Sequence, residues 1–102
     1  MSLDFAVLSE NGTPEETISL SVSLHHELIN AANELSLDQI LRFEDYYEDV
    51  EFVPADLPVL AMQVAVLREK IGPSDLRALL EDLEFLINKA ASHEKTLHAI
   101  AD

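Results

Sequence analysis

Residues 3–22, LDFAVLSENGTPEETISLSV, contain two short runs in which apolar and polar side chains alternate. The apolar members are Leu3, Phe5 and Val7 in the first run and Ile18, Leu20 and Val22 in the second. A period of two is typical of a strand that buries one face. Between the runs, the pair Asn11-Gly12 is a strong turn former. We therefore predict an antiparallel β-hairpin with a long tip.

Four helices are expected after the hairpin, because an isolated hairpin is marginally stable in water and its apolar face needs a cover. The first is predicted over residues 24–35, with Ser23 as its N-cap. The second is predicted to begin at Ser36, since Ser36 and Gln39 have the spacing of a capping box. Its apolar side is expected to contain Leu37, Ile40, Leu41, Phe43 and Tyr47.

The third and fourth helices have the longest apolar patterns in the chain. The third is predicted over residues 57–72, with a proline in its first turn and a glycine at its end. Its apolar residues are Val59, Leu60, Met62, Val64, Val66 and Leu67. Because they surround the helix almost completely, we expect it to be the central element, with Leu60, Val64 and Leu67 most buried. The fourth is predicted over residues 75–92, with a core stripe of Leu76, Leu79, Leu80, Leu83, Leu86, Ile87 and Ala90.

Two further segments complete the predicted fold. Val50–Val53 is a candidate third strand that could add to the hairpin, and Pro54 ends it. Leu97–Ala101 fits either a short strand or a helical turn. We therefore predict a single domain over residues 1–102 of the α+β class, mainly α, in which an N-terminal antiparallel hairpin packs on about four helices.

Length and composition point to a small cytoplasmic domain. A chain of 102 residues is long enough for one core, and the absence of cysteine fits a reducing compartment. The first twelve residues, MSLDFAVLSENG, lack the basic opening and the apolar run of a signal peptide. The longest apolar stretch, Val59 to Leu67, is too short to span a bilayer.

The net charge of −14 is unevenly distributed along the chain. Residues 1–51 contain twelve acids and one base, Arg42, which gives −11, whereas residues 52–102 contain eight acids and five bases, which gives −3. Such a field repels nucleic acid and anionic lipid and accelerates the approach of a basic protein. The alternative interpretation is that the acids only keep the protein soluble.

Motifs of catalysis or of metal and cofactor binding are not found in the sequence. Two glycines are too few for a phosphate-binding loop, and no serine lies in a Gly-x-Ser-x-Gly elbow. His25 and His26 are adjacent, so on a helix they point roughly 100° apart. His93 and His98 are five residues apart, whereas zinc proteases place two histidines four apart. We therefore expect no catalytic residue, no metal, no cofactor and no enzymatic activity.

The acidic segment Phe43–Phe52, FEDYYEDVEF, contains five carboxylates and four aromatic rings. If it continues the second helix, Tyr47 faces the core and Tyr46 faces solvent, about 100° away. The predicted partner-binding residues here are Glu44, Asp45, Tyr46, Tyr47, Glu48, Asp49 and Glu51. In this interpretation Tyr46 is a rigid anchor, and Asp45, Glu48 and Asp49 attract a basic surface. A solvated helix end with two tyrosines at its edge is the alternative.

Phe85 is a further candidate interaction residue. It falls almost opposite the core stripe of the fourth helix. Either another layer of the fold covers it, or it contacts a partner or a second copy of the chain.

The tyrosine pair carries a resemblance to a known class of proteins. A small, acidic, cysteine-free chain with Tyr46 and Tyr47 set among Asp45, Glu48 and Asp49 resembles the immunity proteins of bacterial polymorphic toxins. The acidic inhibitors of nuclease colicins are similar, with adjacent tyrosines among acids on a short helix. The resemblance covers about ten residues and concerns the mode of action, because here a hairpin precedes the helices.

This resemblance implies a bacterial, cytoplasmic inhibitor that binds a basic toxin domain, with a nuclease as the expected toxin. It implies binding to a protein and not to nucleic acid or a membrane. The alternative function is a homo-oligomeric structural or regulatory adaptor without catalytic activity, which self-associates through Phe85.

Overall fold

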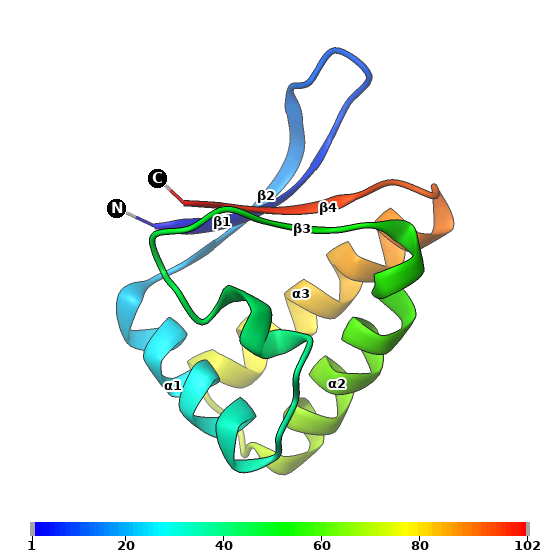
Figure 1. The fold of residues 1–102 in the computed structure, drawn as a ribbon. Coiled ribbons are helices and arrows are strands. Elements are labelled where there is room, and N and C mark those ends of the chain that lie inside the picture. Colours follow the sequence, from blue (N-terminus) through cyan, green and yellow to red (C-terminus); the bar gives the residue numbers. More distant parts are fainter. Residues whose placement is uncertain (1, 102) are drawn as a thin grey trace.

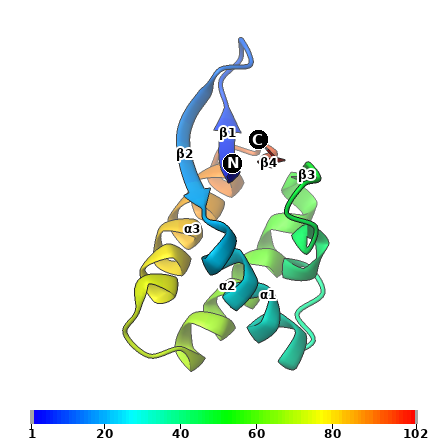
Figure 2. The same ribbon diagram turned by 90° about the vertical axis from the view of Figure 1, so that its left-hand side faces the viewer.

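The protein has an α+β fold, and a computed structural model describes residues 2–101 of it (Figure 1). The elements in chain order are β1 (Leu3–Leu8), β2 (Pro14–Leu20), α1 (Val22–Glu34), η1 (Ile40–Phe43), β3 (Val50–Phe52), η2 (Pro54–Asp56), α2 (Leu57–Lys70), α3 (Asp75–Ser92) and β4 (Leu97–Ala101), where η denotes a 3₁₀ turn. The strands form one antiparallel sheet in the order β2-β1-β4-β3. The three α-helices lie together on one face of this sheet (Figures 1 and 2).

The predicted N-terminal hairpin is confirmed. β1 and β2 pair in antiparallel register, with Leu3 opposite Leu20 and Phe5 opposite Ile18. At the tip, Gly12 has a φ of 83°, and its N–H donates to Ser9 O at 2.9 Å. That backbone conformation strongly favours glycine, which explains the Asn-Gly signal in the sequence. The second run ends earlier than predicted, because Val22 begins α1 and is exposed.

β3 and β4 complete the sheet in an order that the sequence pattern did not give. Residues 97–101 form a strand, and this strand pairs with β1 on one side and with β3 on the other. β3 therefore joins the sheet by pairing with β4 and not with a strand of the hairpin. The outer edge of β3 is covered by Arg42, whose Nη2 donates to Glu51 O at 2.7 Å and whose guanidinium lies 4.5 Å from the centroid of the Phe52 ring.

Three of the four predicted helices are present. α1 begins at Val22, and its N-cap is Ser21 instead of Ser23, because Leu24 N–H donates to Ser21 Oγ at 3.3 Å. α2 covers Leu57–Lys70 and α3 covers Asp75–Ser92, in agreement with the prediction. Each has the expected start, with proline in the first turn of α2 and Ser74 as the N-cap of α3. No helix within residues 2–101 is long and apolar enough to cross a membrane.

The predicted second helix is wrong. Ser36 has a φ of 54°, outside the extended conformation of an N-cap, and only the short turn η1 follows it. The backbone N–H groups of Gln39 and Ile40 donate instead to Gln63 Oε1 of α2, at 2.9 and 3.3 Å. A distant side chain thus satisfies donors that a local cap would have satisfied. The apolar pattern stops at Phe43, and residues 44–49 form an irregular loop.

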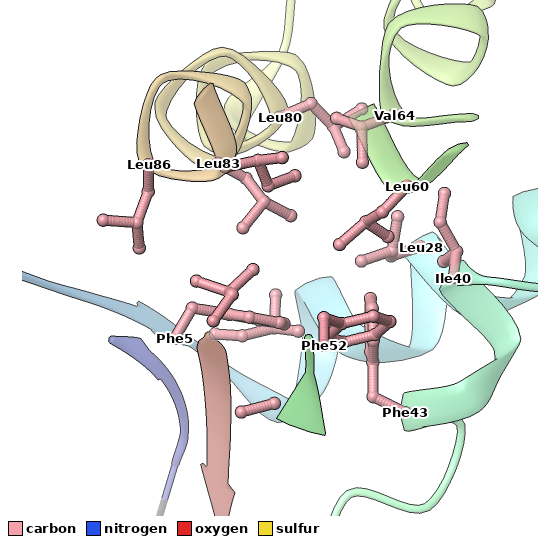
Figure 3. Close-up of a cluster of buried hydrophobic side chains, with 14 of the residues drawn as sticks. Phe5, Leu28, Ile40, Phe43, Phe52, Leu60, Val64, Leu80, Leu83 and Leu86 are labelled. Carbon is pink, nitrogen blue, oxygen red and sulfur yellow. The ribbon is translucent and has the colours of Figure 1, made fainter. Parts of the chain in front are cut away.

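The core lies between the inner face of the sheet and the helices (Figure 3). Phe5 and Phe43 pack edge to face with ring centroids 5.1 Å apart, and Phe52 packs in the same way against Phe43. All seven predicted core residues of α3 are buried, as expected from its pattern: Leu76, Leu79, Leu80, Leu83, Leu86, Ile87 and Ala90. This stripe therefore forms one wall of the core.

α2 is only half buried, which contradicts its predicted central position. Leu60, Val64 and Leu67 are buried as expected, but Val59, Met62 and Val66 are exposed. Figure 1 shows the reason, since α2 lies at the edge of the helical layer and packs on its neighbours with one side only. An apolar sequence all round a helix does not by itself place that helix at the centre.

Candidate functional site

The acidic loop, defined as residues 44–51, contains the irregular segment 44–49 after η1 and the first two residues of the edge strand β3. Its exposed carboxylates are those of Glu44, Asp45, Glu48, Asp49 and Glu51. The nearest base in sequence, Arg42, already forms an ion pair with Asp56 at 3.1 Å and a hydrogen bond with Gln39 at 3.0 Å. The loop therefore keeps a concentrated negative charge on the surface of the molecule.

The two tyrosines of this loop have the opposite orientation to the prediction. Tyr46 is only 8% exposed, and its hydroxyl donates to Leu20 O at 2.8 Å. Tyr47 is 66% exposed. The prediction failed because it assumed that a helix continues through this segment. After Phe43 the chain forms a loop, so the helical angle between the two tyrosine side chains does not apply. Tyr46 is therefore a core residue, and Tyr47 is the aromatic residue that the loop offers to solvent.

A buried histidine helps to hold the loop in place. His25 of α1 is 6% exposed, its Nε2 donates to Phe43 O at 2.8 Å, and its ring lies 4.9 Å from that of Tyr46. From the sequence, His25 was considered only as one of two adjacent histidines that point apart on a helix. Its partner is eighteen residues away, so no local spacing could have revealed the contact.

Two of the acids also stabilise the conformation of the loop. Asp45 Oδ1 accepts a hydrogen bond from Tyr47 N–H at 2.9 Å, which orients the exposed tyrosine. Asp49 Oδ1 accepts one from Ala101 N–H at 2.7 Å, which ties the loop to β4. Within residues 2–101, the carboxylates of Glu44 and Glu48 have no intramolecular hydrogen bond or ion pair. These two carboxylates are therefore available to a partner without a loss of internal contacts.

Glu51 lies at the boundary of the site. It points to the face of the sheet that also carries His98, and its Oε1 is 3.6 Å from His98 Nδ1. At that distance the pair forms an ion pair only when the imidazole is protonated.

Most basic side chains of the protein pair with acids elsewhere. Arg68 contacts Glu84 between α2 and α3 at 2.5 Å. Lys89 donates to Glu16 at 2.6 Å, and this hydrogen bond raises the pKa of the Lys89 ammonium above its ordinary value. These pairs fasten helices and the hairpin to one another and leave the charge of the acidic loop uncompensated.

Phe85 does not belong to the same surface as the acidic loop. It is 66% exposed, so no further layer of the described fold covers it. It lies on α3, and Figure 2 shows α3 and the segment between η1 and β3 on opposite sides of the molecule. The predicted residues thus separate into the acidic loop and an isolated phenylalanine.

The structure offers no cluster suited to a metal ion in the part of the chain that it describes. Histidine, aspartate and glutamate side chains of residues 2–101 nowhere form a group of three with the required geometry. His25 is engaged with Phe43, and His26 lies 3.2 Å from Asn30 on the outer side of α1.

Comparison with known protein families, with curated protein sequences and with solved structures finds no match to this chain. The function is therefore inferred from the chemistry of the described surfaces, of which the acidic loop around Tyr47 has five exposed carboxylates within eight residues.

Proposed function

We propose that this protein is an acidic binding module that inhibits a basic protein by direct contact. As the specific role, we propose a bacterial immunity protein that acts in the cytoplasm and neutralises a cognate toxin, a nuclease. The observation that supports this proposal best is the acidic loop, where a 66% exposed tyrosine lies among carboxylates with which no lysine or arginine of residues 2–101 forms an ion pair.

The acidic loop has the chemistry needed to occupy the cleft of a nuclease. Enzymes that cleave nucleic acid bind phosphates with lysine and arginine, and these residues also attract carboxylates. The charge of the loop raises the rate of encounter with such a cleft, and the net charge of −14 acts in the same direction. The bound loop then excludes the nucleic acid from the cleft.

The structure changes the residue that we assign as the anchor. Tyr46 is buried, so Tyr47 takes this role, with its backbone N–H held by Asp45. Aromatic side chains at the centre of an interface contribute strongly because they bury a large area at a small cost in conformational entropy. Glu44 and Glu48 supply the free charge around it, whereas Asp45 and Asp49 also maintain the loop.

The first test is capture of the partner from an extract of the source bacterium, followed by a nuclease assay. We expect wild-type protein to capture a basic protein that cleaves nucleic acid, and to suppress this cleavage when added in excess. In binding kinetics, Tyr47→Ala should raise the off-rate and weaken binding by about 30-fold, the effect of a 2 kcal/mol anchor. Tyr47→Phe should retain most of the affinity.

The charge of the acidic loop is tested with the double variant Glu44→Gln and Glu48→Gln. It should lower the on-rate at low salt, and the difference from wild type should shrink as salt rises. The matched control is Glu10→Gln with Glu94→Gln, which removes the same charge near the hairpin tip and the start of β4, at the other end of the sheet (Figure 1). An equal loss of on-rate in both double variants, or an unchanged off-rate in Tyr47→Ala, would refute docking through the loop.

A further inference from the structure

The outer side of α2 exposes three large apolar side chains in one line. Val59, Met62 and Val66 are 43%, 58% and 37% exposed. Their spacings of three and four residues place them on a single side of the helix, opposite Leu60, Val64 and Leu67. We call these three exposed residues the α2 ridge. A contiguous apolar surface of this kind marks an interaction site more often than scattered apolar residues do.

The charge around the α2 ridge differs from that of the rest of the protein. The sequence of α2 contains two bases, Arg68 and Lys70, and one acid, Glu69, so its net charge is +1 in a chain of −14. All three charged residues lie in the last turn of the helix. The ridge itself therefore adds no acidic side chain to a contact between two such chains.

We propose that the α2 ridge is the surface through which two copies of this chain associate about a two-fold axis. In a two-fold contact, if one residue of the first copy contacts another residue of the second copy, the same two residues also contact each other with the copies exchanged. The surface must therefore be complementary to itself. The ridge satisfies this condition when the two α2 helices run antiparallel, because Met62 and Val66 of one copy then face Val66 and Met62 of the other.

The charged ends of α2 support this arrangement. Lys70 is exposed and, among the lysines and arginines of residues 2–101, it is the one that makes no intramolecular ion pair. Lys70 lies six residues and Asp56 eight residues from Val64, the midpoint of Met62 and Val66, which is about 9 Å and about 12 Å along the helix on either side. Antiparallel pairing therefore brings Lys70 of each copy to the Asp56 end of the other, where Asp56 Oδ1 can accept from it while Oδ2 keeps its contact with Arg42 of its own chain.

The Phe85 face is the less suitable surface for self-association. Phe85 is the more exposed side chain, but Asp82, three residues before it in the helix, forms no ion pair within residues 2–101, whereas Glu81 and Glu84 pair with Arg77 and Arg68. A two-fold contact there would bring Asp82 towards its own copy, and like charges in close contact are destabilising. Self-association is thus assigned to α2 and not to Phe85, the residue that the sequence pattern singled out.

Sedimentation equilibrium over a concentration series, up to about 1 mM, tests the proposal. We expect the mass to rise from that of one chain to that of two, with tighter association at about 0.5 M salt than at about 0.05 M. Salt screens the repulsion between two chains of charge −14 and leaves apolar contacts in place. Association at an apolar ridge is thereby distinguished from an ionic contact, which salt weakens.

Variants locate the contact. Met62→Asp should lower the association constant by about 30-fold or more, as expected for an apolar residue at the centre of an interface, while circular dichroism confirms the fold. Met62→Gln is a milder second variant, and Phe85→Asp is the matched control that should associate like wild type. Lys70→Glu should weaken association more than Lys95→Glu, which changes the net charge equally outside α2.

A chain that stays monomeric throughout the concentration series at both salt concentrations would overturn the proposal. So would a dimer that Phe85→Asp disrupts and Met62→Asp leaves intact. If the chain stays monomeric and Met62→Asp instead weakens binding of the basic partner, the ridge belongs to that complex and the two-fold contact is wrong. The outcomes measured by sedimentation do not depend on whether the acidic loop binds a toxin.

Discussion

The acidic loop and α2 are neighbours in the sequence, and each exposes apolar side chains to solvent. The loop exposes Tyr47 among five carboxylates, whereas α2 exposes Met62 and its ridge neighbours without an acid until the last turn. The same kind of exposed group therefore lies in two different electrostatic environments. Contacts with the loop should weaken as salt rises, and contacts with the ridge should strengthen.

The two regions also differ in what holds them in place. α2 is anchored by a continuous row of buried apolar residues, including Leu60 and Leu67. The acidic loop is anchored by Tyr46, together with hydrogen bonds from other elements. Each region thus has a buried side that determines stability and an exposed side that is free to bind. Substitutions on one side or the other can therefore distinguish effects on stability from effects on binding.

The largest expected effect comes from the two sides of α2. Leu67→Ala should lower the free energy of unfolding by about 2–5 kcal/mol, because it leaves a cavity beneath a side chain that is 1% exposed. Met62→Ala on the outer side should change it by less than about 0.5 kcal/mol. Denaturant unfolding of both variants measures the difference. Equal losses would mean that α2 is not half buried as described.

An intermediate effect is expected from the two tyrosines. Tyr46→Phe removes the hydroxyl that donates to Leu20 O and should lower the free energy of unfolding by about 1–3 kcal/mol, since a buried carbonyl loses a partner. Tyr47→Phe should have no measurable effect on stability, because its side chain is in solvent. Thermal unfolding of both variants measures the difference. A larger loss of stability in Tyr47→Phe than in Tyr46→Phe would instead support the orientation that helical periodicity predicted.

The smallest effect should come from the free acids of the loop. Glu44→Gln with Glu48→Gln should change the free energy of unfolding by no more than about 0.5 kcal/mol, with a slight increase as the expected direction. The two carboxylates make no internal contact within residues 2–101 and lie among like charges. Melting temperatures at low salt are the measurement. A clear loss of stability would show that Glu44 or Glu48 has a structural role.

Several features of the fold were predictable because the residues that specify them are close in the sequence. The alternation of β1 and β2 and the glycine at their tip gave the hairpin. The seven-residue core stripe of α3 gave its buried face, since the periodicity of a helix is set by its own backbone geometry. The exposure of Phe85 followed from the same periodicity, although the sequence left open whether another layer covered it.

The failures occurred where distant contacts replace local ones. The sequence offered Ser36 as the cap of a second helix, but Gln63, more than twenty residues away, binds the N–H groups of Gln39 and Ile40. Without that helix, the angular relation between Tyr46 and Tyr47 could not be calculated from their positions. The structure thus exchanges the buried and exposed positions of the two tyrosines, and partner binding by the segment stays a prediction.

The sequence by itself determined the α+β class, the hairpin, the spans of α2 and α3, and the concentration of acids in residues 44–51, because periodicity, turn chemistry and charge are local properties. Only the tertiary structure decided the strand order, the exposed side of α2 and which tyrosine is buried. Tyr46 is fixed by a hydrogen bond from its hydroxyl to Leu20 O, twenty-six residues away. β3 is fixed by its pairing with β4, which lies nearly fifty residues later in the chain. A side chain adopts the orientation that the assembled core can pack, and the core exists only once these segments have met.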